Sequence, residues 1–83
     1  MTRNEAYLEI FQIINNPQNK EKLSKYIISS KEEGLGLQWY LENLKTTLNA
    51  LENADGLKKE RLENSFDATL HHIKAVLKEN NII

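Results

Sequence analysis

Apolar residues recur every three or four positions along most of this 83-residue chain, which is the spacing of amphipathic helices. No stretch alternates cleanly between apolar and polar residues, so no strand is predicted. The pattern predicts four helices, over residues 3–15, 17–33, 36–54 and 57–80. Because the breaks between them are short, neighbouring helices should run antiparallel or cross sharply. We therefore expect an all-α fold, a small antiparallel four-helix bundle, with residues 1–83 forming a single helical domain.

The ends of these helices carry recognisable signals. Thr2 and Glu5 have the spacing of a capping box, in which each side chain binds the other residue's backbone N–H. Asn16 precedes Pro17, a pair typical of the cap and the first position of a new helix. Gly34 suits the left-handed residue that follows a helix. The Asp55-Gly56 pair should end the third helix and start the fourth.

One apolar face of each helix should point to a common core. Their members are Tyr7, Ile10, Phe11 and Ile14; Leu23, Tyr26 and Ile27; Leu37, Tyr40, Leu41, Leu44, Leu48 and Leu51; and Leu62, Phe66, Leu70, Ile73 and Leu77. Leu8 lies at the edge of the first face, and the third is the most regular. Burial of these faces has to stabilise the domain, because the chain has no cysteine and so no disulfide.

Five large apolar residues do not belong to these faces, and they are the candidate partner-binding residues: Ile13, Ile28, Trp39, Ile82 and Ile83. Clustered exposed apolar groups mark contact surfaces, and tryptophan is favoured at such contacts. Each also has a purely structural interpretation. Ile13 and Ile28 are buried if the first two helices fold over each other, and Trp39 could seal the corner before its helix. The terminal isoleucines could dock on the bundle or extend from it.

Charge and composition narrow the function classes. Eleven basic and twelve acidic residues give a net charge of −1, which argues against phosphate neutralisation as a main task, so no nucleic acid is expected. The stretch around Gly34 loosely resembles a helix-turn-helix, but its second helix sets Glu42 and Glu52 against Lys45 alone. No segment has the roughly 20 apolar residues of a transmembrane helix. We expect a cytoplasmic location, with peripheral membrane association left open.

The sequence contains no recognisable catalytic, cofactor-binding or metal-binding motif. No residue is therefore predicted for any of these roles, and no enzyme is expected. His71 and His72 are adjacent and point about 100° apart on a helix, too far to grip one ion. His71 shares a stripe with Glu63 and Asp67, but that stripe offers too few ligands for a closed site. The simpler interpretation is an exposed Asp67–His71 pair. No serine is flanked by the glycines of a nucleophile turn, and no phosphate-binding loop is present.

Three segments carry a family resemblance: YLEIFQIINNP, the lysine-rich KEKLSKYIISSKEE, and WYLENLKTTLNAL with its regular leucines. Across its whole length the chain resembles, in architecture and composition, the immunity proteins that accompany class IIa bacteriocins (the enterocin A immunity type). That resemblance implies a cytosolic, cysteine-free antiparallel four-helix bundle from a Gram-positive bacterium. Members often carry a further C-terminal segment that recognises the bacteriocin–receptor complex, and this chain stops at Ile83. No functional residue carries over by motif.

Taken together, the sequence predicts a non-enzymatic helical bundle that binds another protein, with an immunity-type protector as the specific expectation. The alternative is a small regulator of phage or plasmid origin that acts by binding a protein. A homodimer through the off-face residues is compatible with both.

Overall fold

The computed structural model describes residues 1–23 and 37–83. Within them it contains helices α1 (Arg3–Asn15), α2 (Pro17–Lys22), α4 (Leu37–Leu51) and α5 (Gly56–Glu79). No strand occurs in these two ranges, and the predicted all-α fold of a small bundle is confirmed. No helix in the described ranges is both long and apolar enough to span a membrane.

The bounds of three predicted helices agree closely with the structure. The first matches α1 at both ends, and the third and fourth match α4 and α5 to within three residues. α2 is the described part of the predicted 17–33 helix: it ends at Lys22, with Leu23 as its C-cap. The remainder of that prediction, including Gly34 and the candidate residue Ile28, lies outside the described residues.

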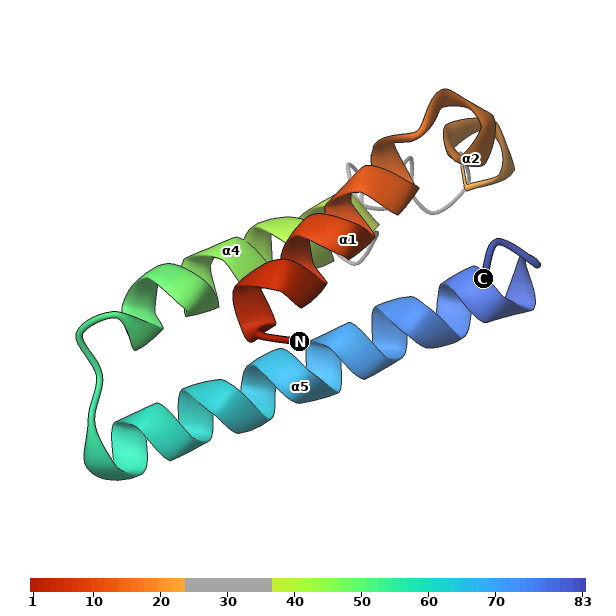
Figure 1. Ribbon diagram of the computed structural model, residues 1–83. Coiled ribbons are helices and arrows are strands. Elements are labelled where there is room, and N and C mark those ends of the chain that lie inside the picture. Colours follow the sequence, from red (N-terminus) through yellow and green to blue (C-terminus); the bar gives the residue numbers. More distant parts are fainter. Residues whose placement is uncertain (24–36) are drawn as a thin grey trace.

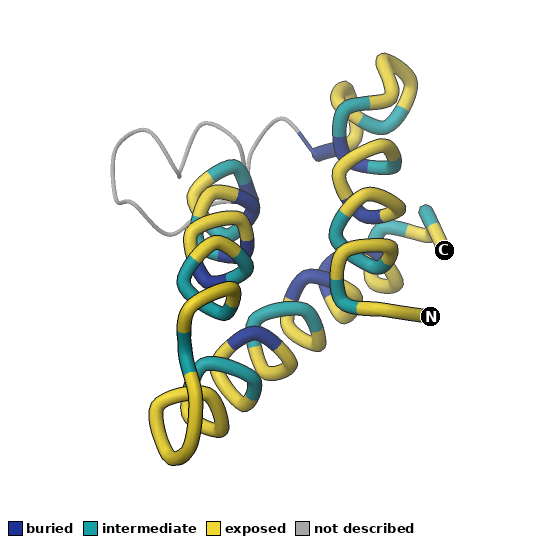
Figure 2. The backbone as a smooth tube through the Cα atoms, turned by 60° about the vertical axis from the view of Figure 1, so that its left-hand side comes forward, coloured by how far each residue is buried: buried dark blue, intermediate teal, exposed yellow. Residues whose placement is uncertain are grey.

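The helices are arranged around the α4–α5 pair. Figure 1 shows these two helices side by side and running in opposite directions on either side of the short connection 52–55. α1 packs against α4, and α2 contacts α1 beyond a sharp corner. In Figure 2 the buried positions of α1, α4 and α5 lie on the sides that face one another.

The core is built from the predicted faces. Its fully buried members are Ile10, Ile14, Leu23, Leu37, Leu41, Leu44, Phe66, Ile73 and Leu77, with Val76 nearly so. Each such side chain contributes about 1.5–3 kcal/mol of transfer free energy when it leaves water. The largest is Phe66, which sits in the middle of α5 and is completely covered.

The predicted face of α1 is correct at Tyr7, Ile10 and Ile14 and wrong at Phe11. Phe11, expected in the core, is 42% exposed, whereas Ile13, expected on the opposite side, is partly buried and packs against the core. The buried side is centred on Ile10 and Ile14, and it is turned away from Phe11. α1 contacts more than one helix: it packs against α4 and α2, and Arg3 binds Asp67 of α5. A single apolar stripe read from its own sequence therefore does not fix its buried side.

Local hydrogen bonds explain where α1 and α2 begin. The Thr2 hydroxyl accepts from the Glu5 backbone N–H at 3.1 Å, and the Glu5 carboxylate accepts from the Thr2 N–H at 3.1 Å. The predicted capping box is therefore confirmed. At the corner, the Asn16 side chain accepts from the Gln18 N–H at 3.0 Å, with Pro17 at the first position of α2.

The start of α5 depends on a glycine. Gly56 is the first residue of α5 and has a φ of +59°, a left-handed conformation that other L-residues adopt only at a cost. Asp55, the N-cap residue, makes no side-chain capping hydrogen bond. The turn therefore relies on backbone freedom at Gly56 rather than on a capping side chain.

Candidate protein-binding surface

The α1–α4 groove is an apolar surface that the sequence interpretation missed. Two side chains of α1, Leu8 and Phe11, are 55% and 42% exposed and lie beside the same groove. They are three residues apart, so they occupy one side of the helix. Leu41 and Leu48 of α4 reach the groove from the opposite wall.

Tyr7 and Lys45 divide this groove into two hollows. The first has a volume of about 280 Å³ and the second about 390 Å³, and both residues line each hollow. The Nζ atom of Lys45 lies 5.8 Å from the centroid of the Tyr7 ring, within cation–π range. The Tyr7 ring in turn contacts that of Phe11, with centroids 5.9 Å apart and planes at 42°. This chain of contacts holds both walls of the groove in place.

Trp39 lies on α4 and is 42% exposed. Its ring meets Tyr40 edge-on, with centroids 5.2 Å apart and planes at 77°. Tyr40 then contacts the His72 ring of α5 at 4.9 Å. The tryptophan is thus partly packed through an aromatic series that joins α4 to α5, and partly exposed. Leu35, over which the ring was expected to lie, falls outside the described residues.

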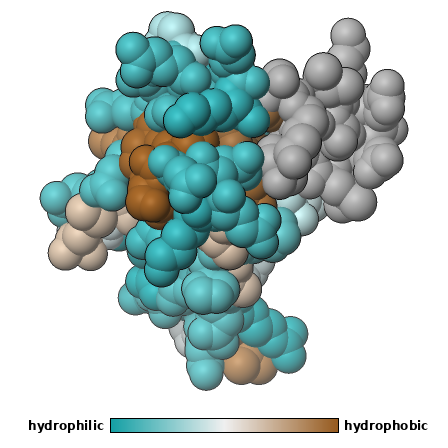
Figure 3. All heavy atoms as spheres, turned by 90° about the vertical axis from the view of Figure 1, so that its right-hand side faces the viewer, coloured by the Kyte–Doolittle hydropathy of each residue, from teal (hydrophilic) through white to brown (hydrophobic). Residues whose placement is uncertain are grey.

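The C-terminal isoleucines have different environments. After α5, Asn81 adopts a left-handed φ of 58°, the Ile82 N–H donates to the Leu77 carbonyl at 2.9 Å, and the Asn81 N–H donates to that of Lys78 at 3.1 Å. These two bonds form a Schellman motif. Ile82 consequently packs against the core, while Ile83 is 53% exposed. Figure 3 shows apolar side chains gathered among polar ones at the end of the molecule where α2 and the C terminus lie.

The four predicted contact residues that lie in the described ranges do not share one surface. Ile13 and Ile82 pack against the core, which accounts for both without a partner. Trp39 and Ile83 remain exposed, on α4 and beyond the end of α5 respectively. Leu8 was assigned only to the edge of a core face, and Phe11 to its middle. The sequence signal that could have found them is Leu8 itself, a large apolar residue off the centre of its stripe.

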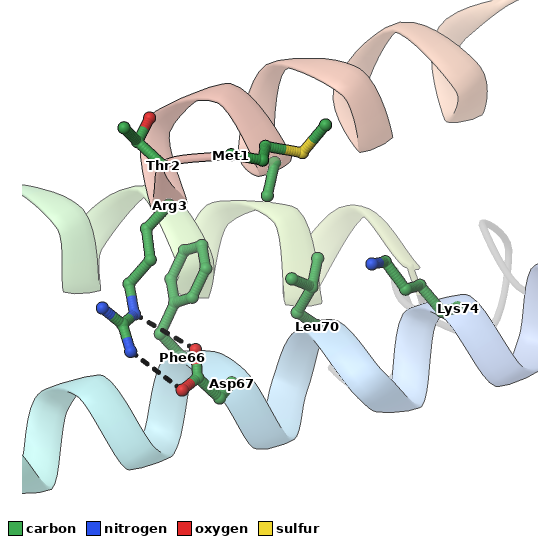
Figure 4. A pocket seen from close by; sticks show the side chains of 8 residues that line it. Met1, Thr2, Arg3, Phe66, Asp67, Leu70 and Lys74 are labelled. Carbon is green, nitrogen blue, oxygen red and sulfur yellow. Dashed lines mark hydrogen bonds and ion pairs between the residues drawn. The ribbon is translucent and has the colours of Figure 1, made fainter.

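Arg3 joins α1 to α5 by an ion-pair network (Figure 4). Its Nε and Nη2 atoms donate to the two carboxylate oxygens of Asp67 at 3.1 and 2.9 Å, and its Nη1 atom donates to Glu63 at 3.2 Å. The hydrogen bonds to Asp67 raise the pKa of the Arg3 guanidinium. The expected Asp67–His71 pair is absent among the described residues, and both oxygens of this carboxylate accept hydrogen bonds from Arg3 instead.

Beside this network lies an open hollow of about 590 Å³ between α1 and α5. Figure 4 shows Arg3 and Asp67 at one end, Lys74 at the other, and Phe66 and Leu70 along the α5 wall. The charged groups at the Arg3 end of this hollow, Arg3 and Asp67, already bind each other. We therefore interpret the hollow as a part of the α1–α5 contact and not as a ligand site.

Residues 1–23 and 37–83 contain no group of three or more His, Cys, Asp or Glu side chains placed to hold a metal ion. Within the same ranges every buried side-chain nitrogen and oxygen has a hydrogen-bond partner. The large apolar side chains exposed among these residues are Met1, Leu8, Phe11, Trp39, Leu57 and Ile83, and of these Leu8 and Phe11 line the α1–α4 groove.

Comparisons of the chain with protein-family models, with characterised proteins and with solved structures gave no significant match. The functional argument therefore rests on the geometry described above.

Proposed function

We propose that this chain is a non-enzymatic protein-binding module and that the α1–α4 groove is its contact surface. The observation that carries the proposal is the exposure of Leu8 and Phe11 side by side along a hollowed surface. Both are large apolar groups held on a helix, and adjacent apolar groups of this kind favour burial against a partner. Because the helix already fixes their backbone, binding there needs no ordering of the chain itself.

The groove has the composition of an interface centre. It combines aromatic side chains, Tyr7 and Phe11, with leucines on the opposite wall, and its rim carries amides and a hydroxyl. Aromatic anchors within a polar rim are where binding energy concentrates. Trp39, on the same helix α4, offers a further exposed ring.

At the cellular level we propose an immunity-type protector in the cytoplasm of a Gram-positive bacterium. The family resemblance of the sequence supports this narrower reading, and the all-α architecture agrees with it. A protein-binding regulator of phage or plasmid origin would use the same groove. The two roles therefore differ in the partner that is bound and in the effect on the cell, and not in the fold.

The contact surface is tested by site-specific photo-crosslinking. A photo-reactive amino acid replaces Leu8 in one variant and Asn64, an exposed position on α5, in a matched control. We expect a crosslinked protein from cells of a Gram-positive host for the first variant only. That protein is then purified, and its affinity for wild type and for the Leu8→Ser, Phe11→Ser double variant is measured by calorimetry. Equal affinities for the two would overturn the assignment of the groove.

The protector role is tested separately, by expressing the chain in bacteriocin-sensitive strains. Raised survival against one bacteriocin of a broad panel, abolished in the same double variant, would support it. Unchanged sensitivity across the whole panel would favour the regulator instead.

A further inference from the structure

The two hollows of the α1–α4 groove differ in chemistry. Apart from Tyr7 and Lys45, which both share, the first is lined by Asn4, Leu8, Leu48 and Asn49, and the second by Phe11, Gln38, Leu41, Glu42 and Thr46. Both hollows contain the Lys45 cation, and the first adds two amides and no carboxylate. The second adds an aromatic and an aliphatic wall, with the carboxylate of Glu42 at its side.

Lys45 is available to an acidic partner. Among the described residues it forms no ion pair, and its ammonium group rests over the Tyr7 ring. A cation held over an aromatic face keeps its charge and has unused donors, since an ammonium group has three N–H bonds. The amide side chains of Asn4 and Asn49 line the same hollow and can donate further hydrogen bonds. This end of the groove thus suits a carboxylate.

The second hollow suits a large apolar side chain. Phe11 is 42% exposed at its edge, and Leu41, which is buried, forms part of its wall. Covering Phe11 would remove its remaining apolar surface from water, which is favourable in proportion to the area covered.

The distance between the two features matches one turn of a helix. Lys45 and Leu41 are four residues apart on α4, or about 6 Å along its axis at 1.5 Å per residue. A helix lying along the groove would bring residues i and i+4, or i and i+3, to these two positions. Two parallel walls formed by helices also provide the surface into which a third helix packs.

We infer that the groove binds one amphipathic helix of a partner protein, and that this helix carries an acidic residue for Lys45 and a large apolar residue one turn away for the Phe11–Leu41 hollow. This inference rests on the proposed function and specifies its partner. The carboxylate replaces water around the Lys45 ammonium group, and the apolar side chain covers Phe11. The partner is thus distinguished by the spacing of two side chains on a single helical face.

The test uses a phage-displayed library of 18-residue alanine-rich helices, randomised on one face. Selection is made against the wild-type protein, after removal of peptides that bind the Leu8→Ser, Phe11→Ser variant. We expect the enriched peptides to share an acidic and a large apolar residue three or four positions apart. Circular dichroism of every protein variant establishes that it is folded before its affinities are compared.

A charge exchange then tests the role of Lys45. Lys45→Glu should lower the affinity for the selected acidic peptide about tenfold or more. A peptide with lysine in place of its acidic residue should bind the Lys45→Glu protein with much of the lost affinity restored. Lys58→Glu, an exposed position on α5 with the same change in net charge, should alter affinity less than about twofold. Equal effects of the two protein variants would overturn the inference.

Three outcomes separate the inference from the proposed function. Enriched peptides without a shared acidic position would overturn the inference, and a partner crosslinked at position 8 would then leave the proposed function standing. A wild-type dimer that the double variant abolishes, measured by sedimentation, would identify a second copy as the occupant and overturn the inference. Peptides of the expected pattern without any crosslinked cellular partner would support the inference about groove chemistry and count against the proposed function.

Discussion

Arg3 and Asp67 connect the first turn of α1 to the middle of α5 through two parallel hydrogen bonds of 3.1 and 2.9 Å. Planar guanidinium and carboxylate groups match in this geometry, which fixes their relative orientation as well as their distance. Glu63 adds a third bond at 3.2 Å, one turn earlier on α5. Since the two ends of this contact are 64 residues apart in sequence, it restricts how α1 sits on the α4–α5 pair.

We predict a measurable but small coupling between these two residues. A double-mutant cycle with Arg3→Gln and Asp67→Asn should give about 0.5–1 kcal/mol, because both side chains are partly exposed and water screens the pair. The coupling should fall as salt is raised from low ionic strength to 1 M. Lys74→Gln serves as the control, since Lys74 makes no ion pair within the described ranges. A coupling that does not respond to salt would contradict the ion-pair interpretation.

The exposed residues of the groove should matter less for stability than the core of the same helix. The Leu8→Ser, Phe11→Ser double variant should lower the free energy of unfolding by roughly 1–2 kcal/mol, because Leu8 and Phe11 are 55% and 42% exposed and lose only part of a buried side chain's transfer free energy. Ile10→Ala, in the core of the same helix, should cost about 2–5 kcal/mol. Urea unfolding of the three proteins measures both values. A loss in the double variant as large as that of Ile10→Ala would show that Leu8 and Phe11 belong to the core.

Sequence patterns predicted those features that depend on near neighbours. The bounds of α1 follow from Thr2, Glu5 and Asn16, whose hydrogen bonds all close within a few residues. The buried side of α1 was less predictable, because a single helix does not indicate how many others it will contact. Phe11 lay within the arc of apolar residues on α1, yet in the structure Ile10 and Ile14 face the other helices and the Phe11 ring is left at the groove.

The candidate site was harder to predict than the fold for the same reason. Lys45 and Tyr7 belong to different helices, 38 positions apart, and only packing brings the ammonium group over the ring. Ile82 was hard to predict for a local reason instead. Its burial follows from a left-handed Asn81, a conformation that asparagine tolerates but does not require.

Trp39→Ala should give an intermediate loss of stability. A buried tryptophan costs about 3–5 kcal/mol when truncated, but this ring is 42% exposed. Its edge contact with Tyr40 adds about 0.5–1.5 kcal/mol beyond burial. We therefore expect a loss of roughly 1–3 kcal/mol, measured by urea unfolding. A change near zero would indicate a ring that serves binding alone, and a loss at the full value of a buried tryptophan would indicate a corner seal.

Gly56 should be intolerant of a side chain for conformational reasons only. No atom outside its immediate neighbours lies within 4 Å of the position that a Cβ would take, so Gly56→Ala creates no clash. Its φ of +59° should nevertheless make that substitution cost about 1–2 kcal/mol. Gly56→Asn should cost less, because asparagine enters the left-handed region more readily. Thermal unfolding of the two variants tests this order, and a Gly56→Ala protein as stable as wild type would contradict it.

The capping box should contribute a pH-dependent part of the stability. The Thr2 backbone N–H, and then its side chain, hold the pKa of Glu5 below its usual value. A carboxylate with a lowered pKa in the folded state stabilises the protein above the pKa of the unfolded chain, near 4.3 for glutamate. This contribution is lost as the pH falls through the lower, folded value. Glu5→Gln should therefore flatten the acid side of the stability profile between about pH 5 and pH 3. Glu9→Gln, at an exposed position on the same helix, is the control. An equal effect of the two variants on the profile would show that general charge, rather than the cap, determines the acid response.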